Sequence, residues 1–396
     1  MLALKSKILL FPYWIILKFR HFLYDKGILK STSYPIPVIC VGNITVGGTG
    51  KTPHTEMIIR MLQEKYRIAV LSRGYKRKSK GFRIAGPGDT FAEIGDEPMQ
   101  IKHKFPHITV AVCADRREGI EKLLALPEGS AAGAAGSAAG RAGAAGAVGA
   151  GSAGKFAAGG AAAPCRPELI ILDDAFQHRR VKPSHSIVLM NWNNPIYSDN
   201  LLPIGRLRDL PEQIRRADSI IVTKSPRFGE HDGIIDDELA AEQLVPVEKE
   251  WRRKLHLRVD QKLCFSTIMY GTPAGVEGAE ADNRYLYSKS AIFFTGIAND
   301  REFRDHIAGS YEIQSSIKFP DHYSFTKYNI KDINNWAALH PTAVVFTTEK
   351  DCMRLTGNPY LSPGLKKRLF YIPIEVKILG CQNFPYFASE PQREAT

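Results

Sequence analysis

Short apolar runs alternate along the chain with longer stretches in which apolar residues return every three or four positions. The short runs are rich in Val and Ile and predict buried strands over residues 36–41, 68–71, 108–112, 169–172, 187–190 and 220–222. The first longer stretch predicts a helix over residues 52–65, with an apolar face made of Met57, Ile58, Met61 and Leu62. Strands that alternate with helices predict an α/β fold with a parallel sheet, whose ligands bind at the carboxyl ends of the strands.

A second pattern of the same kind begins near residue 262. It predicts strands over residues 291–295, 343–347 and 369–372. It predicts helices over residues 300–308 and 331–339. A charged stretch of helical character, residues 227–260, separates the two patterns. We therefore predict a larger domain over residues 31–250 and a smaller α/β domain over residues 251–396.

Residues 129–163 interrupt the first pattern, because they are almost all Ala, Gly and Ser. Such a segment has too little side chain to bury and cannot offset its ordering entropy. Its frequent glycines also oppose helix formation. We predict a disordered surface insertion that acts as an inert linker.

The first 30 residues combine basic charge with an apolar run. Six Lys and Arg residues stand against one acid, Asp25, and the apolar run over residues 8–17 has ten positions. A bilayer span needs about 20 such residues, and no small-residue cleavage site follows the run. We predict an amphipathic helix over residues 1–30 that lies on an anionic membrane surface, with Tyr13 and Trp14 among the headgroups. The alternative is a helix that docks on the protein's own core.

Composition narrows the class of protein. Apolar residues make up 44% of the 396 positions and charged residues 24%, which is typical of a globular protein and excludes a collagen-like or wholly disordered chain. Six cysteines without a CxxC pair exclude a disulfide scaffold, argue against structural zinc and favour a cytosolic compartment. The net charge of +12 indicates an anionic partner, which could be nucleic acid, an acidic membrane surface or a phosphorylated substrate.

A glycine-rich loop follows the first predicted strand and precedes the first predicted helix. In such a loop the backbone amides cradle phosphates, Lys51 reaches the β- and γ-phosphates of ATP, and the Thr52 hydroxyl binds Mg²⁺. Thr45 stands where the common pattern has glycine, and a glycine-rich turn without function is the alternative. The residues predicted to bind ATP are Thr45, Val46, Gly47, Gly48, Thr49, Gly50, Lys51 and Thr52.

The predicted strand over residues 169–172 ends in two acids, Asp173 and Asp174. Side chains alternate along a strand, so the two carboxylates should point to different sides. One of them can bind Mg²⁺ beside the phosphate loop while the other orients or neutralises a neighbour. A helix cap is the alternative role for the pair.

Further motifs extend over most of the chain. The phosphate loop continues into Pro53, and the acid pair continues into Ala175-Phe176-Gln177-His178-Arg179. The others are Ser72-Arg73-Gly74-Tyr75, Gly95-Asp96-Glu97-Pro98, Leu201-Leu202-Pro203-Ile204-Gly205-Arg206-Leu207-Arg208-Asp209, Thr295-Gly296-Ile297-Ala298-Asn299, Phe319-Pro320-Asp321-His322-Tyr323 and Thr347-Thr348-Glu349-Lys350-Asp351. In this order they resemble the tetraacyldisaccharide 4′-kinase family of bacterial lipid A biosynthesis, whose phosphate loop also accepts a residue other than glycine at the position of Thr45.

The resemblance implies an enzyme at the cytoplasmic face of the inner membrane, with two α/β domains and an active site in the cleft between them. It implies transfer of the γ-phosphate of ATP to the 4′-hydroxyl of a tetraacyldisaccharide 1-phosphate, which gives lipid IVA. The lipid disaccharide and the anionic membrane surface are then the partners. Two positions depart from the family: Ala175 replaces a glycine, and Asp209 replaces a glutamate that is one methylene longer.

The resemblance also implies residue roles. Asp96 is the candidate general base, assisted by His322 from the smaller domain, while Lys51 and Arg208 stabilise the transferring phosphate. The Mg²⁺ ligands would come from Thr52, Asp173, Asp174 and Asp209. The candidate substrate-binding residues are Arg73, Tyr75, Gln177, His178 and Arg179. The alternatives are that Asp96 caps a helix, that His322 is a turn residue and that the basic residues form a solvated loop. The motif over residues 347–351 receives no role.

Two other functions are weighed against the kinase. A dimeric, membrane-associated ATPase with a deviant phosphate loop would carry a lysine where Val46 stands. A nucleic-acid-binding NTPase would agree with the net charge, but the basic residues are not interleaved with aromatic residues and no recognition motif appears. We therefore expect no nucleic-acid partner.

Overall fold

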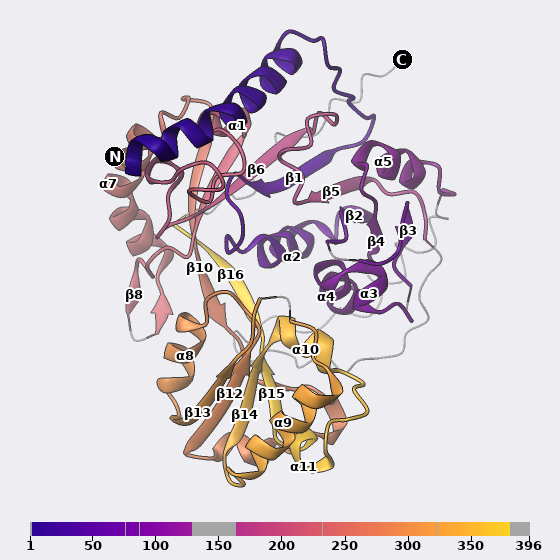
Figure 1. Cartoon of the computed structure of the whole chain (residues 1–396), viewed down its shortest axis with the longest axis vertical. Helices are drawn as coiled ribbons and strands as arrows, with labels where there is room; N and C mark the ends of the chain where they lie inside the picture. The colour runs from indigo at the N-terminus through magenta and orange to yellow at the C-terminus, as the bar shows by residue number, and fades with distance from the viewer. Residues whose placement is uncertain are drawn as a thin grey trace.

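The computed structural model describes residues 2–75, 77–86, 88–128, 164–231, 233–321 and 323–380, with only the backbone of residues 2–10 and 279. The predicted insertion over residues 129–163 lies outside the described residues, and so does His322. Two large sheets organise the described chain, and helices cover both (Figure 1), while β8 (Glu230–His231) and β9 (Ile234–Ile235) form a separate two-stranded sheet.

The larger sheet has nine strands among the described residues, and its inner strands are parallel. Only its two outermost strands, β3 and β16, run antiparallel to their neighbours. In spatial order the strands are β16 (Ile374–Leu379), β10 (Lys262–Tyr270), β7 (Ser219–Thr223), β6 (His185–Asn191), β1 (Val38–Asn43), β5 (Leu169–Asp173), β2 (Ile68–Ser72), β4 (Thr109–Val112) and β3 (Arg83–Ile84). All six strands predicted for the first pattern are confirmed, with shifted ends.

Both faces of this sheet are buried, as the unbroken apolar runs predict. In β1, Val38 and Cys40 pack into one core, and Ile39 and Val41 pack into the core on the opposite face. One face is covered by α2 (Lys51–Leu62), α3 (Phe91–Ile94) and α4 (Asp96–Lys104), and the other by α1 (Leu2–Asp25), α5 (Arg116–Leu124) and α7 (Asp237–Leu255).

The predicted apolar face of α2 is wrong at one position. Met57, Ile58 and Leu62 are buried as predicted, but Met61 is exposed and Ile59 takes its place in the core. The helix therefore turns the side that carries Thr55 and Ile59 toward the sheet, and Met61 lies beyond the edge of the contact.

The smaller sheet has five strands among the described residues. Their order is β11 (Ala274–Gly275), β15 (Leu369–Ile372), β14 (Val344–Thr348), β12 (Ser290–Thr295) and β13 (Glu312–Lys318). Its helices are α8 (Arg301–Ala308), α9 (Lys327–Ala338), α10 (Glu349–Leu355) and α11 (Pro363–Lys366). β12, β14, β15, α8 and α9 are confirmed predictions, whereas the polar edge strand β13 was not predicted.

The predicted domain boundary at residue 250 does not follow the sheets. Strands β10 and β16 lie beyond it, but both belong to the larger sheet, where they pair with each other from Phe265↔Leu379 to Tyr270↔Ile374. Their apolar residues Leu263, Phe265 and Leu379 complete the larger core. The smaller unit is therefore inserted between these two strands, and Figure 1 shows β10 and β16 leading from one sheet to the other.

Candidate active site

The glycine-rich loop leads from the carboxyl end of β1 into α2. Gly47, Gly48 and Gly50 have φ values of 66°, 67° and 75°, in the left-handed region that glycine adopts without strain. No side chain caps the first turn of α2 after Gly50. The first amides of the helix are thus open to an anion, and the helix dipole favours negative charge there.

The first half of the loop is held in place by a neighbouring segment. The amide of Val46 donates to the carbonyl of Arg206 at 2.8 Å, and the amide of Arg208 donates to the carbonyl of Ile44 at 2.9 Å. Thr45 lies between these bonds in an antiparallel bridge with Leu207. A β-branched residue suits this extended conformation, which explains why Thr45 can stand where other loops have glycine.

Asp173 lies at the end of β5 and is almost completely buried. Its carboxylate accepts hydrogen bonds from the hydroxyls of Thr55 at 3.4 Å and Ser72 at 3.5 Å. Burial and the negative charges of Glu97 and Asp174 raise the pKa of Asp173 to about 7. The side chain therefore faces inward, beneath the loop.

Asp174 has other partners than Asp173, but it follows β5 with a left-handed φ of 50°, so the turn after the strand sets its direction and the predicted strand alternation does not. Arg208 binds both of its oxygens, and the Nζ of Lys51 lies 3.9 Å from Oδ1. Burial alone would raise the pKa of Asp174, but the hydrogen bonds from Arg208 and the positive charges of Lys51 and Arg208 lower it. Arg208 also donates to the carbonyl of Asn43 at 3.2 Å, so it joins the acid to the start of the loop.

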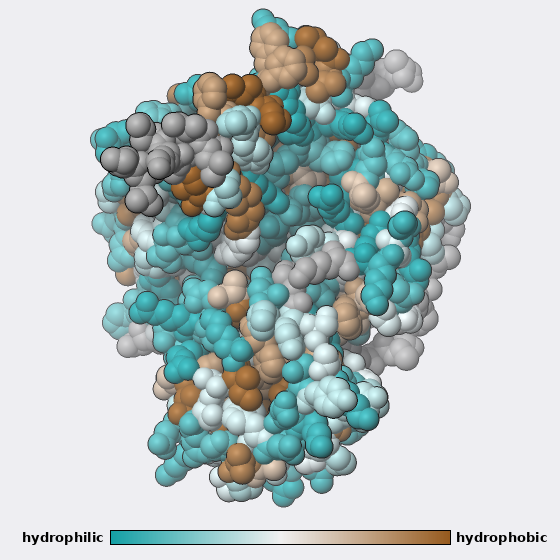
Figure 2. Space-filling view, viewed as in Figure 1, coloured by the Kyte–Doolittle hydropathy of each residue, from teal (hydrophilic) through white to brown (hydrophobic). Residues whose placement is uncertain are grey.

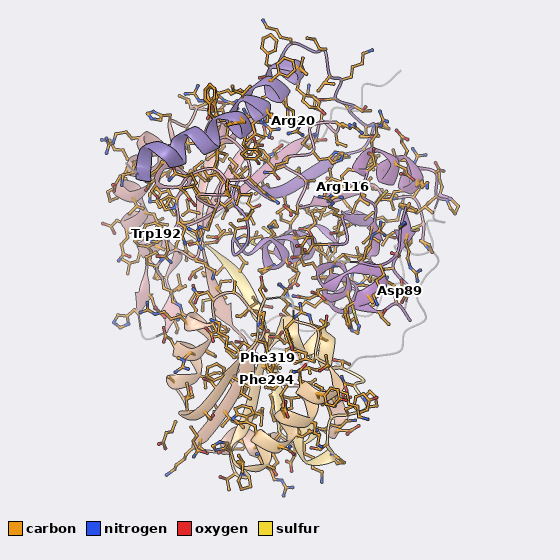
Figure 3. All side chains as sticks on the ribbon, in the orientation of Figure 1. Arg20, Asp89, Arg116, Trp192, Phe294 and Phe319 are labelled. Atoms are coloured by element: carbon orange, nitrogen blue, oxygen red, sulfur yellow. The ribbon has the colours of Figure 1, made fainter. Side chains whose placement is uncertain are left out.

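Arg116, at the start of α5, was not predicted from the sequence as a residue of the site. Its side chain is buried in the larger domain (Figure 3) and donates to the carbonyls of Cys113 at 2.7 Å and Asp173 at 3.0 Å. It therefore holds the backbone of the acid pair. Its position just after a strand was the one available signal.

The three predicted substrate residues after the acid pair lie between the sheet edge and α1. Gln177 donates to the carbonyl of Asn43 at 2.6 Å, and Arg179 forms an ion pair with Asp25 at 2.6 Å. The Nδ1 of His178 is buried and has no hydrogen-bond partner in the described part of the chain. Two of the three side chains are thus occupied with the protein's own groups in this structure.

Asp209 is buried and contacts α1 in this structure. Its Oδ1 lies 2.6 Å from the Nε2 of His21 in α1 and accepts the amide of Leu210 at 2.9 Å. Arg216 lies 3.8 Å from Oδ2. This geometry does not support the role of Mg²⁺ ligand, because the carboxylate serves to anchor α1.

Two predicted motifs meet near the amino end of α4. A Cβ atom on Gly95 would lie 3.2 Å from the carbonyl oxygen of Tyr75, so the two loops are in contact. Gly95 has a φ of 94° and is followed by Asp96, the first residue of α4. Arg73 and Tyr75 are exposed beside it. The predicted pairing of Asp96 with His322 stays a prediction, since His322 lies outside the described residues.

The motif over residues 347–351, to which no role was given, lies in the smaller domain beside Asp96. Asp351 accepts hydrogen bonds from the amide of Gly296 at 2.8 Å and the hydroxyl of Thr348 at 2.7 Å. Arg354 donates to Asp351 at 3.1 Å and also to Asp96 of the larger domain. Two sequence motifs thus meet at one buried ion pair between the domains.

The donor set suits Mg²⁺ bound together with a nucleotide. The hydroxyl of Thr52 and the carboxylate of Asp174 are hard oxygen ligands at the loop. Mg²⁺ typically takes one or two carboxylates, substrate phosphates and waters. The described residues hold no cluster of three or more His, Cys, Asp or Glu side chains able to bind a metal ion alone.

Comparison with known proteins agrees with this geometry. A family model described as tetraacyldisaccharide-1-P 4′-kinase matches residues 6–386. The chain is 39% identical over 378 residues to a tetraacyldisaccharide 4′-kinase of Porphyromonas gingivalis, covering 94% of this chain and 91% of that one. A protein of the same name from Parabacteroides distasonis is 40% identical over 372 residues, covering 92% and 88%.

A solved structure is also similar. The crystal structure of LpxK from Aquifex aeolicus in complex with ATP superposes with a TM-score of 0.62 at 26% identity, covering 95% of each chain. The match includes both α/β units.

Proposed function

Since this chain belongs to the tetraacyldisaccharide-1-P 4′-kinase family, we propose that it transfers the γ-phosphate of ATP to the 4′-hydroxyl of a tetraacyldisaccharide 1-phosphate. The product of this reaction is lipid IVA. The observation that supports the proposal most directly is the open amino end of α2, with Lys51 3.9 Å from Asp174. Phosphoryl transfer asks a protein mainly for positioning and charge neutralisation, and this site offers both.

The nucleotide would be bound by the loop amides and Lys51. Thr52 and Asp174 would hold Mg²⁺, which supplies charge neutralisation at the phosphates when it is bound. Asp174 suits this role because its pKa is lowered and it lies at the mouth of the loop. Asp173 is more buried and would orient the loop helix through Thr55.

Arg208 is proposed to act on the transferring phosphate. In this structure its guanidinium group binds Asp174, beside Lys51. A nucleotide phosphate offers a competing anion at the same place. Arg208 would then stabilise the charge that spreads over the phosphoryl oxygens.

The acceptor is a sugar hydroxyl of high pKa, so a general base should help the reaction. We assign this role to Asp96, with His322 as its partner from the smaller domain. Both assignments rest on the family motifs. Asp96 contacts the smaller domain through Arg354, which agrees with a base that lies in the cleft.

The assay must separate transfer from hydrolysis. With radiolabelled ATP, we expect label to enter a lipid disaccharide 1-phosphate and little phosphate to be released when the acceptor is left out. Acceptor-independent hydrolysis, with no labelled lipid, would instead favour the membrane-associated ATPase. That alternative already lacks its lysine, since Val46 stands at the position.

We also place the protein at the cytoplasmic face of the inner membrane, bound through α1. Leu17 and His21 of this helix face the protein, whereas its outer side exposes large apolar residues (Figure 2). These residues are Phe11, Trp14, Ile15, Ile16, Phe19 and Phe22. A cavity of about 280 Å³ beside the helix is lined by Phe11, Trp14 and residues of the 199–211 segment. Within the described residues, no helix is both long and apolar enough to span a bilayer.

Vesicle flotation tests the membrane proposal. Ile16→Glu with Phe19→Glu should release the protein from vesicles that contain phosphatidylglycerol, because two charges would enter the apolar boundary. Ile234→Glu with Val259→Glu is the matched control, since both residues are highly exposed elsewhere on the surface. Equal binding of the two double variants would contradict the proposal.

A further inference from the structure

Arg354 is a buried cation that joins the two domains at the candidate base. Its side chain is only 1% exposed. It donates to Asp351 on its own helix at 3.1 Å and to Oδ2 of Asp96 on the other domain. A buried guanidinium group is costly unless it is paired and hydrogen-bonded, so these two carboxylates determine where Arg354 can lie.

Asp351 is itself fixed from two sides. The amide of Gly296 at the end of β12 donates to its Oδ2 at 2.8 Å, and the hydroxyl of Thr348 donates to the same oxygen at 2.7 Å. A Cβ atom on Gly296 would come within 2.8 Å of Oδ1 of Asp351, so only glycine allows this approach. The end of β12 and the start of α10 therefore aim Arg354 at the larger domain.

We propose that Arg354 is a positioning residue for phosphoryl transfer, which fixes the carboxylate of Asp96 and couples its orientation to the seating of the smaller domain. The inference rests on the proposed role of Asp96 as the general base. A charged hydrogen bond to Oδ2 restricts the plane of the carboxylate and favours its ionised form, which is the form that accepts a proton. Misplacement of a reacting group by 1 Å can cost about 10²-fold in rate, so such control matters.

A second ion pair at the same interface provides the control. Lys104 at the end of α4 lies 2.6 Å from Glu56 of the larger domain and 2.6 Å from Glu349 of the smaller one. It crosses between the domains, as Arg354 does, but does not bind Asp96. If Arg354 only tied the domains together, removing either cation would have the same kind of effect.

The experiment compares Arg354→Gln, Arg354→Lys and Lys104→Gln in the full-length chain, with ATP and the lipid acceptor. Arg354→Gln should lower kcat by about 10–100-fold with little change in the KM for ATP. In Arg354→Gln, the acidic limb of the plot of kcat against pH should move to higher pH. The reason is that a carboxylate that loses a cationic neighbour keeps its proton to higher pH. Arg354→Lys should recover part of kcat and part of the shift. Lys104→Gln should lower the melting temperature but keep the wild-type pH profile.

The outcomes separate the two proposals. If Asp96→Asn is inactive while Arg354→Gln keeps the wild-type acid limb, Arg354 is only a tie between domains and the inference is overturned. If Asp96→Asn turns over like the wild type, the assignment of the base is overturned and this inference with it. Should Arg354→Gln fail to fold, Arg354→Met, which keeps an apolar stem without the charge, takes its place, and an unshifted acid limb with unchanged kcat in that variant would overturn the inference.

Discussion

In each domain a helix follows the carboxyl end of a strand, but the amino ends of the two helices are capped differently. In the larger domain, α2 follows β1 through the glycine loop, and no side chain caps its first turn. In the smaller domain, α10 follows β14 directly, and the hydroxyl of Thr348 accepts the amide of Asp351 at 3.2 Å. The first turn of α10 also carries the acids Glu349 and Asp351.

The difference decides which helix end can receive a phosphate. An N-cap side chain satisfies amides that would otherwise bind an anion, and carboxylates in the first turn supply the negative charge that the helix dipole favours. The amino end of α10 is therefore complete without a ligand and serves as a joint that aims Arg354. The amino end of α2 has Lys51 and open amides, so only it is suited to ATP.

The largest effect should follow from removing the cation at the open helix end. Lys51→Ala should lower transfer by at least about 10²–10³-fold, because it removes the charge proposed to face the β- and γ-phosphates. Calorimetry with ATP and Mg²⁺ should show a matching loss of affinity. Lys327→Ala is the matched control, because Lys327 is also the first residue of its helix but follows the capping residue Thr326. Equal loss in both variants would remove the distinction between open and capped ends.

The second effect concerns stability of the nucleotide-free protein and its pH dependence. Burial raises the pKa of Asp173 to about 7, above its usual value, so the folded state binds this proton more tightly than the unfolded state. Between about pH 4 and pH 7 the native state holds one more proton at this site, and stability from this group falls as the pH rises. Above pH 7 the free energy of unfolding has lost the whole contribution of this proton, which is of the order of a few kcal/mol.

Asp173→Asn tests that sign. The melting temperature of the variant relative to wild type should rise between pH 5 and pH 8, because the asparagine does not titrate. Glu375→Gln is a surface control, since Glu375 is largely exposed. If the difference in melting temperature between Asp173→Asn and the wild type stays constant from pH 5 to pH 8, the raised pKa of Asp173 is contradicted.

The third effect lies in the loop backbone. Gly50→Ala should destabilise the fold by about 1–2 kcal/mol, because alanine is strained at a φ of 75°. The added methyl group would make ordinary contacts with His54 at 3.5 Å and Pro53 at 3.7 Å, so strain and not a clash sets the cost. ATP affinity should fall as well. Gly364→Ala, at an open position in α11 without a positive φ, should be neutral or slightly stabilising in the same denaturant titration.

Local patterns predicted the parts of the molecule that are local in sequence. Strand, glycine loop and helix follow one another between residues 38 and 62, and the acid pair lies at the end of its predicted strand, with Asp173 as the last residue of β5. The family resemblance added Asp96. These elements need only short-range periodicity and turn chemistry to be recognised.

What could not be predicted depends on pairings between distant segments. Asp96 and Arg354 are 258 positions apart, and Asp209 and His21 are 188 apart. Neither partner carries a local sign of the other, so the motif around Asp351 had no predicted role and the contact of Asp209 with α1 was not predicted. The edge strand β13 was missed because it has only two apolar residues, Ile313 and Ile317, and all of its residues are exposed or half-buried.

The smallest effect should follow from opening the closed helix end. Thr348→Ala removes the cap of α10 and should cost about 1 kcal/mol of unfolding free energy. ATP affinity should stay unchanged, because α10 lacks the glycine loop and keeps its two acids, whereas Thr348→Ser should keep the hydroxyl and most of the stability. A gain of nucleotide or phosphate binding in Thr348→Ala would mean that capping alone separates the two helix ends. Unchanged binding with lower stability would mean that the left-handed glycines and Lys51 are needed in addition to open amides, so the comparison rests on the loop as a whole.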